Sequence, residues 1–189
     1  MKKEIIITNA RLSFPDLETP KSVSGGKPRF GAVLLLDKDK DKKTIDKIEA
    51  VLKEIAKEEF GGKLPTGNDT CLRDGDDKEY DGYANTRTLH ASRAEKRGKP
   101  IVISGDKTPV KPGDANYPYA GCYVNAKVSI FSLNGKNDKG GDKTHGKKLC
   151  CELQVLQWAK KGEPFGSGTP TTDDMPEVEA EDDEDLGEL

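Results

Sequence analysis

The chain has 189 residues and a net charge of −3, which fits one small domain with appendages. Leu, Ile, Val and Phe make up 38 residues, about a fifth of the chain, close to the level below which charged chains stay disordered. No apolar run approaches the ~20 residues of a membrane helix, and the Met-Lys-Lys-Glu start lacks the apolar stretch of a signal peptide. The sequence therefore predicts a cytoplasmic protein without a membrane segment, with a small ordered body and long polar connections.

The net charge averages two unlike parts of the chain. Residues 171–189 contain ten acidic residues and no basic residue. Without them, 31 basic residues stand against 24 acidic ones, a net charge of +7. We therefore expect a basic folded domain over residues 1–170 and an acidic, disordered tail over residues 171–189. A solvated tail that only aids solubility is the alternative.

In chain order, the first half predicts two strands and a helix. Residues 4–14 are rich in β-branched side chains and predict a strand that ends at Pro15, which cannot continue a central ladder. Residues 30–37 form a continuous apolar run, typical of a strand buried on both faces. Between residues 41 and 60, apolar side chains recur at three- and four-residue steps until Gly61, which indicates an amphipathic helix.

The second half predicts strands separated by polar loops. Residues 63–85 are polar and rich in Gly and Asp, which predicts a long loop. Two short strands are expected within residues 86–92 and 99–104, and two longer ones over residues 121–134 and 149–158. Because strands dominate, we expect a mainly β fold, a small antiparallel barrel or sandwich with one helix.

Strand alternation predicts which side chains of the last two strands face the core. The expected core residues are Cys122, Val124, Ala126, Val128, Ile130, Leu149, Cys151, Leu153 and Val155. The residues expected to face outward include Tyr123, Lys127, Phe131, Glu152, Gln154 and Trp158. The four cysteines show no paired CxxC spacing, so we expect them to be packing residues in a reducing compartment.

Basic charge interleaved with aromatic rings is the main functional signal. Single-stranded nucleic acid needs cations for its backbone and flat rings for its unpaired bases. The alternative for each ring is packing in the core. The candidate DNA-binding residues are Tyr80, Tyr83, Arg87, His90, Arg93, Lys96, Arg97, Tyr123, Lys127, Phe131, Lys147, Lys148 and Trp158.

Other constellations give weaker signals. The acids Asp37, Asp39 and Asp41 begin like a calcium loop, but the required Gly and Glu positions hold other residues. The GDKTHGKK segment lacks the Ser or Thr and the following helix of a P-loop. A metal-dependent nuclease using Asp74, Asp76 and Asp77 with His90 remains one rival hypothesis, and an adaptor that contacts only proteins is another. We expect no metal and no cofactor.

Three segments carry a resemblance to a known family. NARLSFPDL, AGCYVNAKVSIFSLNGK and ELQVLQWAKKGEPFG, followed by the acidic tail, resemble a family of phage-encoded single-stranded DNA-binding proteins, and the likeness runs from Ile5 to Phe165. It implies an OB-fold, a five-stranded Greek-key barrel, and a role in binding that involves no catalysis. Whether the chain forms homo-oligomers stays open.

We therefore expect one DNA groove and a functional tail. The groove would combine the strand face carrying Tyr123, Lys127 and Phe131, the cluster around Arg87 and Arg93, and the basic loop near residues 136–148. The tail would compete with DNA for this groove or recruit replication or recombination proteins through Leu186 and Leu189.

Overall fold

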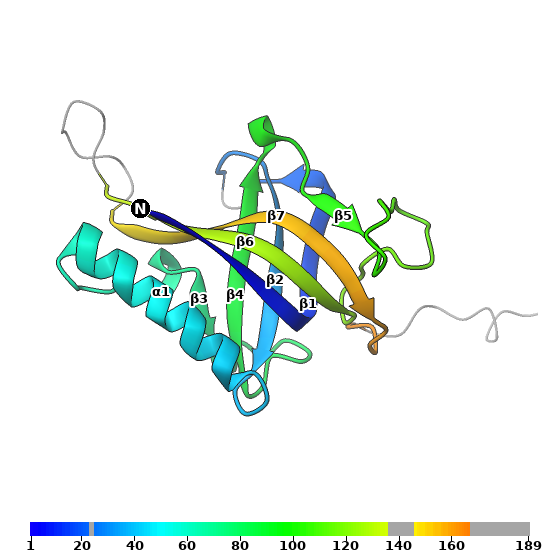
Figure 1. Ribbon diagram of the computed structural model, residues 1–189, viewed down its shortest axis with the longest axis horizontal. Coiled ribbons are helices and arrows are strands. Elements are labelled where there is room, and N and C mark those ends of the chain that lie inside the picture. Colours follow the sequence, from blue (N-terminus) through cyan, green and yellow to red (C-terminus); the bar gives the residue numbers. More distant parts are fainter. Residues whose placement is uncertain (23–24, 136–145, 167–189) are drawn as a thin grey trace, which may run out of the picture.

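The computed structural model describes residues 1–22, 25–135 and 146–166 (Figure 1). The acidic tail and the lysines at positions 136, 139 and 143 lie outside the described residues. Among those described are one α-helix, three short 3-10 helices and seven strands. Their bounds are β1 Lys2–Lys21, β2 Arg29–Asp37, α1 Lys42–Phe60, η1 Gly67–Asp69, β3 Leu72–Asp74, η2 Gly75–Asp77, β4 Thr86–Ala94, η3 Glu95–Arg97, β5 Ile101–Ile103, β6 Tyr123–Leu133 and β7 Lys148–Lys160.

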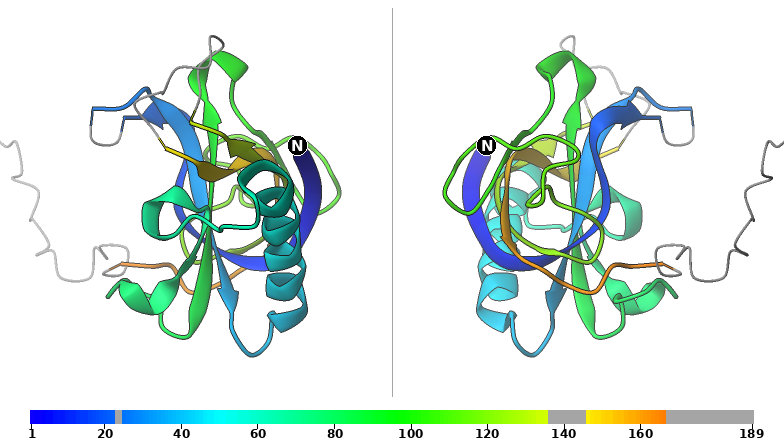
Figure 2. Two further views of the ribbon diagram at one scale, coloured as in Figure 1. Left: turned by 90° about the vertical axis from the view of Figure 1, so that its left-hand side faces the viewer. Right: turned by 90° about the vertical axis from the view of Figure 1, so that its right-hand side faces the viewer.

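The sheet has the strand order β3-β4-β2-β1-β6-β7-β5. Its five long strands are contiguous and curl around a common interior, as the end-on views in Figure 2 show. The long strand β1 joins the two halves, because its first part pairs with β6 and its second part with β2. The predicted mainly β fold with one helix is confirmed, but the described sheet has seven strands rather than five, because the three-residue strands β3 and β5 extend its two edges.

The barrel closes between β4 and β7 through side chains. No hydrogen-bonded ladder joins β4 to β7 in the part of the chain that the structure describes, although a single bridge links Thr70 to Leu149. Beside it the buried Cys71 and Cys151 thiols interact, and Arg93 forms an ion pair with Glu152. Cys71, Cys122 and Cys151 are buried free thiols, as expected for packing residues.

Helix α1 covers one side of the barrel, against β1, β2 and β6. Ile45, Ile48, Leu52 and Ile55 form its buried face. The helix ends at Gly61, whose φ of 68° is left-handed, so glycine suits the position. The helix predicted over residues 41–60 is confirmed. Among the described residues no helix is long and apolar enough to cross a membrane.

Two predicted boundaries were wrong in the first half of the chain. Strand β1 continues past Pro15 to Lys21, because its register with β2 is irregular between Ser13 and Asp16 and Pro15 needs no ladder hydrogen bond there. The expected loop of residues 63–85 contains the short strand β3, which pairs with β4. Neither the irregular register of β1 nor the short strand β3 shows a hydrophobic period that would predict it from the sequence.

The facing of β7 was predicted correctly only for its first part. Leu149, Cys151 and Leu153 are buried, but β7 has one extra residue opposite the step from Lys127 to Val128 of β6. This bulge reverses the alternation. Trp158 and Leu156 therefore face the core, and the inward prediction for Val155 was wrong.

Candidate nucleic-acid interface

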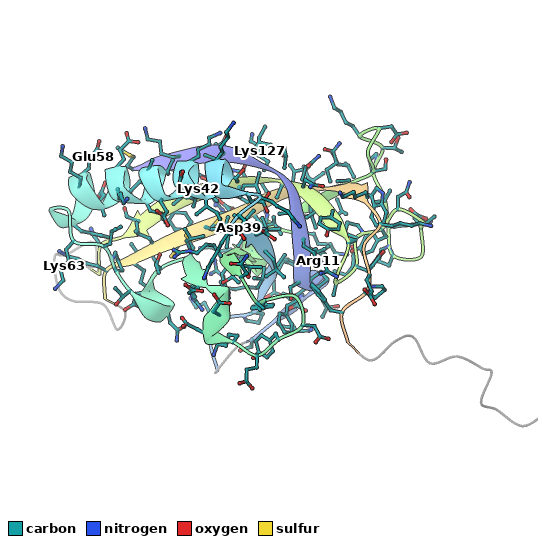
Figure 3. All side chains as sticks on the ribbon, turned by 90° about the horizontal axis from the view of Figure 1, so that it is seen from below. Arg11, Asp39, Lys42, Glu58, Lys63 and Lys127 are labelled. Atoms are coloured by element: carbon teal, nitrogen blue, oxygen red, sulfur yellow. The ribbon has the colours of Figure 1, made fainter. Side chains whose placement is uncertain are left out.

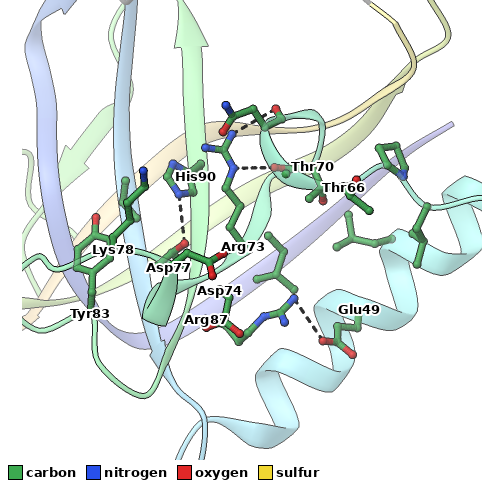
Figure 4. A pocket seen from close by; sticks show the side chains of 18 of the residues that line it. Glu49, Thr66, Thr70, Arg73, Asp74, Asp77, Lys78, Tyr83, Arg87 and His90 are labelled. Carbon is green, nitrogen blue, oxygen red and sulfur yellow. Dashed lines mark hydrogen bonds and ion pairs between the residues drawn. The ribbon is translucent and has the colours of Figure 1, made fainter.

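A groove of about 960 Å³ lies over the outer face of β4 and β2, between α1 and the segment that precedes β4 (Figure 4). Val33, Thr88 and His90 form part of its floor, while Leu34 and Leu89, next to them in sequence, point into the barrel. A second hollow of about 290 Å³ continues toward Lys148 and the start of β7. The two hollows share Phe14, Asp16, Val33, Asn68, Thr70, Arg73 and His90 in their linings.

Aromatic rings form one wall of the groove. Tyr83 is buried against Val33 and Leu35, and its hydroxyl donates a hydrogen bond to Ser13 Oγ at 3.3 Å. Burial raises the pKa of Tyr83. The Tyr80 ring stands edge-on to Tyr83 with centroids 5.2 Å apart, and 51% of Tyr80 is exposed. The half-exposed Tyr80 ring is therefore supported by the buried ring of Tyr83.

The segment that carries these rings is fastened to the loop after β2. Lys38 Nζ lies 2.8 Å from Asp74 and 2.6 Å from Asp76, and these hydrogen bonds lower the pKa of both carboxyl groups. The Asn85 N–H donates to Asp76 at 2.7 Å. A Cβ at Gly75 would collide with the Thr86 hydroxyl. These acids thus have structural partners, and among the described residues no three His, Cys, Asp or Glu side chains group as metal ligands.

The lining of the groove mixes basic residues with acidic ones and holds a neutral histidine; the basic residues are Lys53, Arg73, Lys78 and Arg87, and the acidic ones are Asp16, Glu49, Asp74 and Asp77. Arg87 Nη2 lies 3.6 Å from Glu49 of α1, and Arg87 Nε is buried without a hydrogen-bond partner. Arg73 donates from Nε to the Thr70 carbonyl at 3.0 Å and shares the floor with Lys78. Burial, with the nearby charges of Arg73 and Lys78, lowers the pKa of His90 to about 4.

The structure brings together four of the predicted site residues, which are Tyr80, Tyr83, Arg87 and His90. Tyr83 is buried within the wall and supports it, whereas Tyr80, Arg87 and His90 line the groove. Sequence reasoning missed Phe14, Arg73 and Lys78, which also line it. Arg73 and Lys78 fell in the predicted loop of residues 63–85, where their basic charge was the only available signal.

A second group of predicted residues forms an ion cluster at the barrel closure. Glu152, which was predicted to face outward, is only 4% exposed because basic side chains cover its carboxylate. Its carboxylate binds Arg93 Nη1 at 2.9 Å, Arg97 Nη1 at 2.6 Å and Lys2 Nζ at 3.3 Å. Burial would raise the pKa of Glu152, but hydrogen bonds from Arg97 and Lys2 outweigh it, so the pKa is lowered. Lys96 is exposed on η3 beside this cluster.

The predicted face of β6 lies elsewhere on the barrel. Tyr123, Lys127 and Phe131 do not line either hollow, because β2 and β1 separate β6 from β4. Lys127 pairs with Glu4 at 3.1 Å and lies beside β1 in Figure 3. Lys160 sits 4.6 Å from the centre of the Tyr123 ring. The β6 face is therefore separate from both hollows, and its role in DNA binding stays a prediction.

The last three predicted residues lie in different surroundings. Trp158 is 7% exposed and packs against Tyr119, so the expectation that it faces outward was wrong. Lys147 lies 5.5 Å from the centre of the Phe60 ring. Lys148 pairs with Asp69 at 3.1 Å and lines the second hollow. Of these three, only Lys148 reaches the groove system.

A β-barrel whose strand face carries a groove with cations and aromatic rings is similar to the OB-fold proteins that bind oligonucleotides. The family model described as Enterobacter phage Enc34, ssDNA-binding protein matches residues 3–186 of this chain. The chain belongs to this family. Protein p50 of Acyrthosiphon pisum secondary endosymbiont phage 1 is 33% identical over 194 aligned positions, covering 97% of this chain and 98% of that protein.

Solved structures of phage proteins share the fold. The single-stranded DNA-binding protein from bacteriophage Enc34 has a TM-score of 0.69 and 23% identity over 90% of this chain and 88% of that one. The same protein in complex with ssDNA gives a TM-score of 0.70 at 23% identity, covering 86% and 89%. The single-stranded DNA-binding protein gp2.5 of bacteriophage T7 gives 0.53 at 16% identity, covering 94% and 96%.

Proposed function

We propose that this protein binds single-stranded DNA without sequence preference, in the groove over β4 and β2. The observation that carries the proposal is the exposed Tyr80 ring beside the floor cations Arg73, Lys78 and Arg87. The ring can stack on any base, while the cations contact phosphates, which carry no sequence information. The biological role would be protection of phage single strands in the host cytoplasm during replication, recombination or repair.

The decisive experiment is a titration of the full chain with single-stranded DNA, duplex DNA and RNA at two salt concentrations. We expect single-stranded oligo-dT to bind more tightly than duplex DNA, and affinity to fall as salt rises, because neutralised phosphates release counterions. An affinity that stays constant between low and high salt contradicts the electrostatic part. No binding to single strands at low salt favours the adaptor hypothesis.

The protein acts by binding rather than by cleaving DNA in this proposal. Asp74 and Asp76, two of the three acids of the rival nuclease hypothesis, are both bound to Lys38. Incubation of end-labelled single strands with magnesium or manganese tests this point. An intact, shifted oligonucleotide is expected, and shortened products would contradict a purely binding role.

We also propose that the acidic segment of residues 171–189 competes with DNA. The described part of the chain ends beside the aromatic wall, where Phe165 packs against the cluster that contains Tyr83 and the Gly166 N–H donates to Asp81 at 3.1 Å. An acidic segment tethered there has a high effective concentration near the cations Arg73, Lys78 and Arg87 of the groove. Removing residues 171–189 is expected to tighten oligo-dT binding at low salt. Unchanged affinity would leave recruitment of replication or recombination proteins as the role of the segment.

A further inference from the structure

Phe14 has an unfavourable backbone conformation. Its φ of 45° lies in the left-handed region, which a phenylalanine rarely adopts. It falls where the register between β1 and β2 is irregular, between Ser13 and Asp16. The ring gains little burial in return, because 54% of Phe14 is exposed. Strained residues of this kind are held by their surroundings and gather at functional sites.

The irregularity changes the direction in which Phe14 points. Leu12 is fully buried in the barrel, and in a regular strand Phe14, two positions later, would follow it into the core. Instead Phe14 lines both hollows on the outer face. Ser13, between them, is buried and accepts the hydrogen bond from Tyr83. The fold thus moves a large apolar ring from the core to the groove and anchors it there.

Phe14 completes the aromatic wall. Its ring stands edge-on to Tyr80, with centroids 5.4 Å apart and planes at 74°, and 6.4 Å from Tyr83. Tyr80 and Phe14 are each about half exposed, and Tyr83 is buried behind them. Because Phe14 belongs to the lining of both hollows, it lies where they join. A DNA strand that runs from one hollow to the other would contact the Phe14 ring.

We propose that Phe14 is a base-stacking residue, and that its ligand is an unpaired base at the junction of the two hollows. This inference rests on the proposed function and adds a residue that the basic and aromatic pattern of the sequence did not reveal. The aromatic ring supplies a flat apolar face, and the strained turn fixes it before DNA arrives. Pre-organisation of this kind reduces the ordering cost of binding.

The test compares Phe14→Gly with the wild-type chain for binding of oligo-dT. Glycine adopts a positive φ without strain, so this variant removes the ring while keeping the turn, and its thermal midpoint should match or exceed that of the wild type. We expect affinity to fall about 5- to 150-fold, the range that corresponds to one lost stack. Ile6→Ala is the matched control, since Ile6 is exposed on the same strand outside both hollows.

Two further measurements separate stacking from a structural role. The loss caused by Phe14→Gly should largely disappear on an abasic strand of equal length, which keeps the phosphates but has no bases. Phe14→Trp should retain tight binding, whereas Phe14→Leu, apolar but not flat, should not. An equal loss on the abasic strand would overturn stacking.

The proposed function and this inference fail in different ways. If the wild-type chain does not bind oligo-dT, both are overturned. If the wild-type chain binds and Phe14→Gly binds equally well, only the inference is overturned.

Discussion

Arg87 and Arg97 belong to one basic stretch of the sequence, but they have opposite surroundings in the fold. Arg87 lines the groove, has a loose contact of 3.6 Å to Glu49 and leaves its Nε without a partner. Arg97 lies 2.6 Å from both oxygens of Glu152, a carboxylate that is nearly buried. The quality of the existing partner decides whether an arginine remains available for a phosphate.

The same contrast predicts that the Glu152 cluster contributes to the stability of the fold and that the groove cations contribute to DNA binding. The Glu152 cluster spans the gap between β4 and β7, which no backbone ladder joins among the described residues. Breaking a buried ion pair leaves a charge without compensation and is costly. In the groove, Arg87 has only the 3.6 Å contact with Glu49, a carboxylate more exposed than Glu152, so its loss should cost less stability and more DNA affinity. The following variants test this division.

The largest expected effect is on the free energy of unfolding of Glu152→Gln. Removing the carboxylate leaves Arg93 and Arg97 without their shared partner, and we expect a loss of about 3 kcal/mol at neutral pH. Chemical denaturation measures it. Glu49→Gln is the control, because the Glu49 contact with Arg87 is more exposed and should be worth less than about 1 kcal/mol. Equal costs for both variants would remove the distinction between the clusters.

The stability difference between wild type and Glu152→Gln should also depend on pH. The folded state lowers the pKa of Glu152, so the contribution is fully present above the unfolded value of about 4.3. It is lost as pH falls through the lower folded pKa. The difference should therefore be constant from pH 8 to 6 and shrink below pH 4. A difference that grows in acid would contradict the ion cluster.

The next effect is on DNA affinity. Arg87→Ala should weaken oligo-dT binding about tenfold and reduce the slope of log affinity against log salt by about one, as expected for one lost phosphate contact. Arg97→Ala should lower the thermal midpoint while leaving the salt slope unchanged. Titrations at three salt concentrations measure both. A reduced slope for Arg97→Ala alone would place the DNA at the Glu152 cluster instead.

The main elements of the fold were predictable, because long strands and helices repeat one hydrophobic period. Val124, Ala126, Val128 and Ile130 of β6, and Cys122 just before it, are all buried, as their alternation predicts. A single inserted residue in β7 was enough to reverse the facing of Trp158. Bulges have no periodic signal, so the sequence alone cannot locate them.

The site was less predictable because it depends on contacts between distant segments. Arg93 and Glu152 are 59 positions apart, and nothing near Arg93 in the chain shows that its charge is already paired. Tyr80 and Tyr83 look equivalent in sequence, yet Tyr83 is buried and Tyr80 is half exposed. Phe14 lies in a β-rich segment, so no pattern in the sequence indicated that its ring lines the groove. Residue types indicated the chemistry of the groove, while tertiary packing selected which residues take part.

The smallest expected effect is a pH dependence of DNA binding through His90. Its pKa of about 4, set by burial and by Arg73 and Lys78, makes the ring neutral at pH 7. A phosphate bound nearby favours the charged ring and raises this pKa, so affinity should be constant from pH 8 to 6 and then increase as pH falls. A rise of one unit corresponds to about a twofold gain at pH 5. His90→Gln should abolish the gain, since glutamine keeps a polar side chain without a titrating ring. If the variant retains the same gain, the proton is taken up at another group, and His90 is then a structural residue of the groove floor.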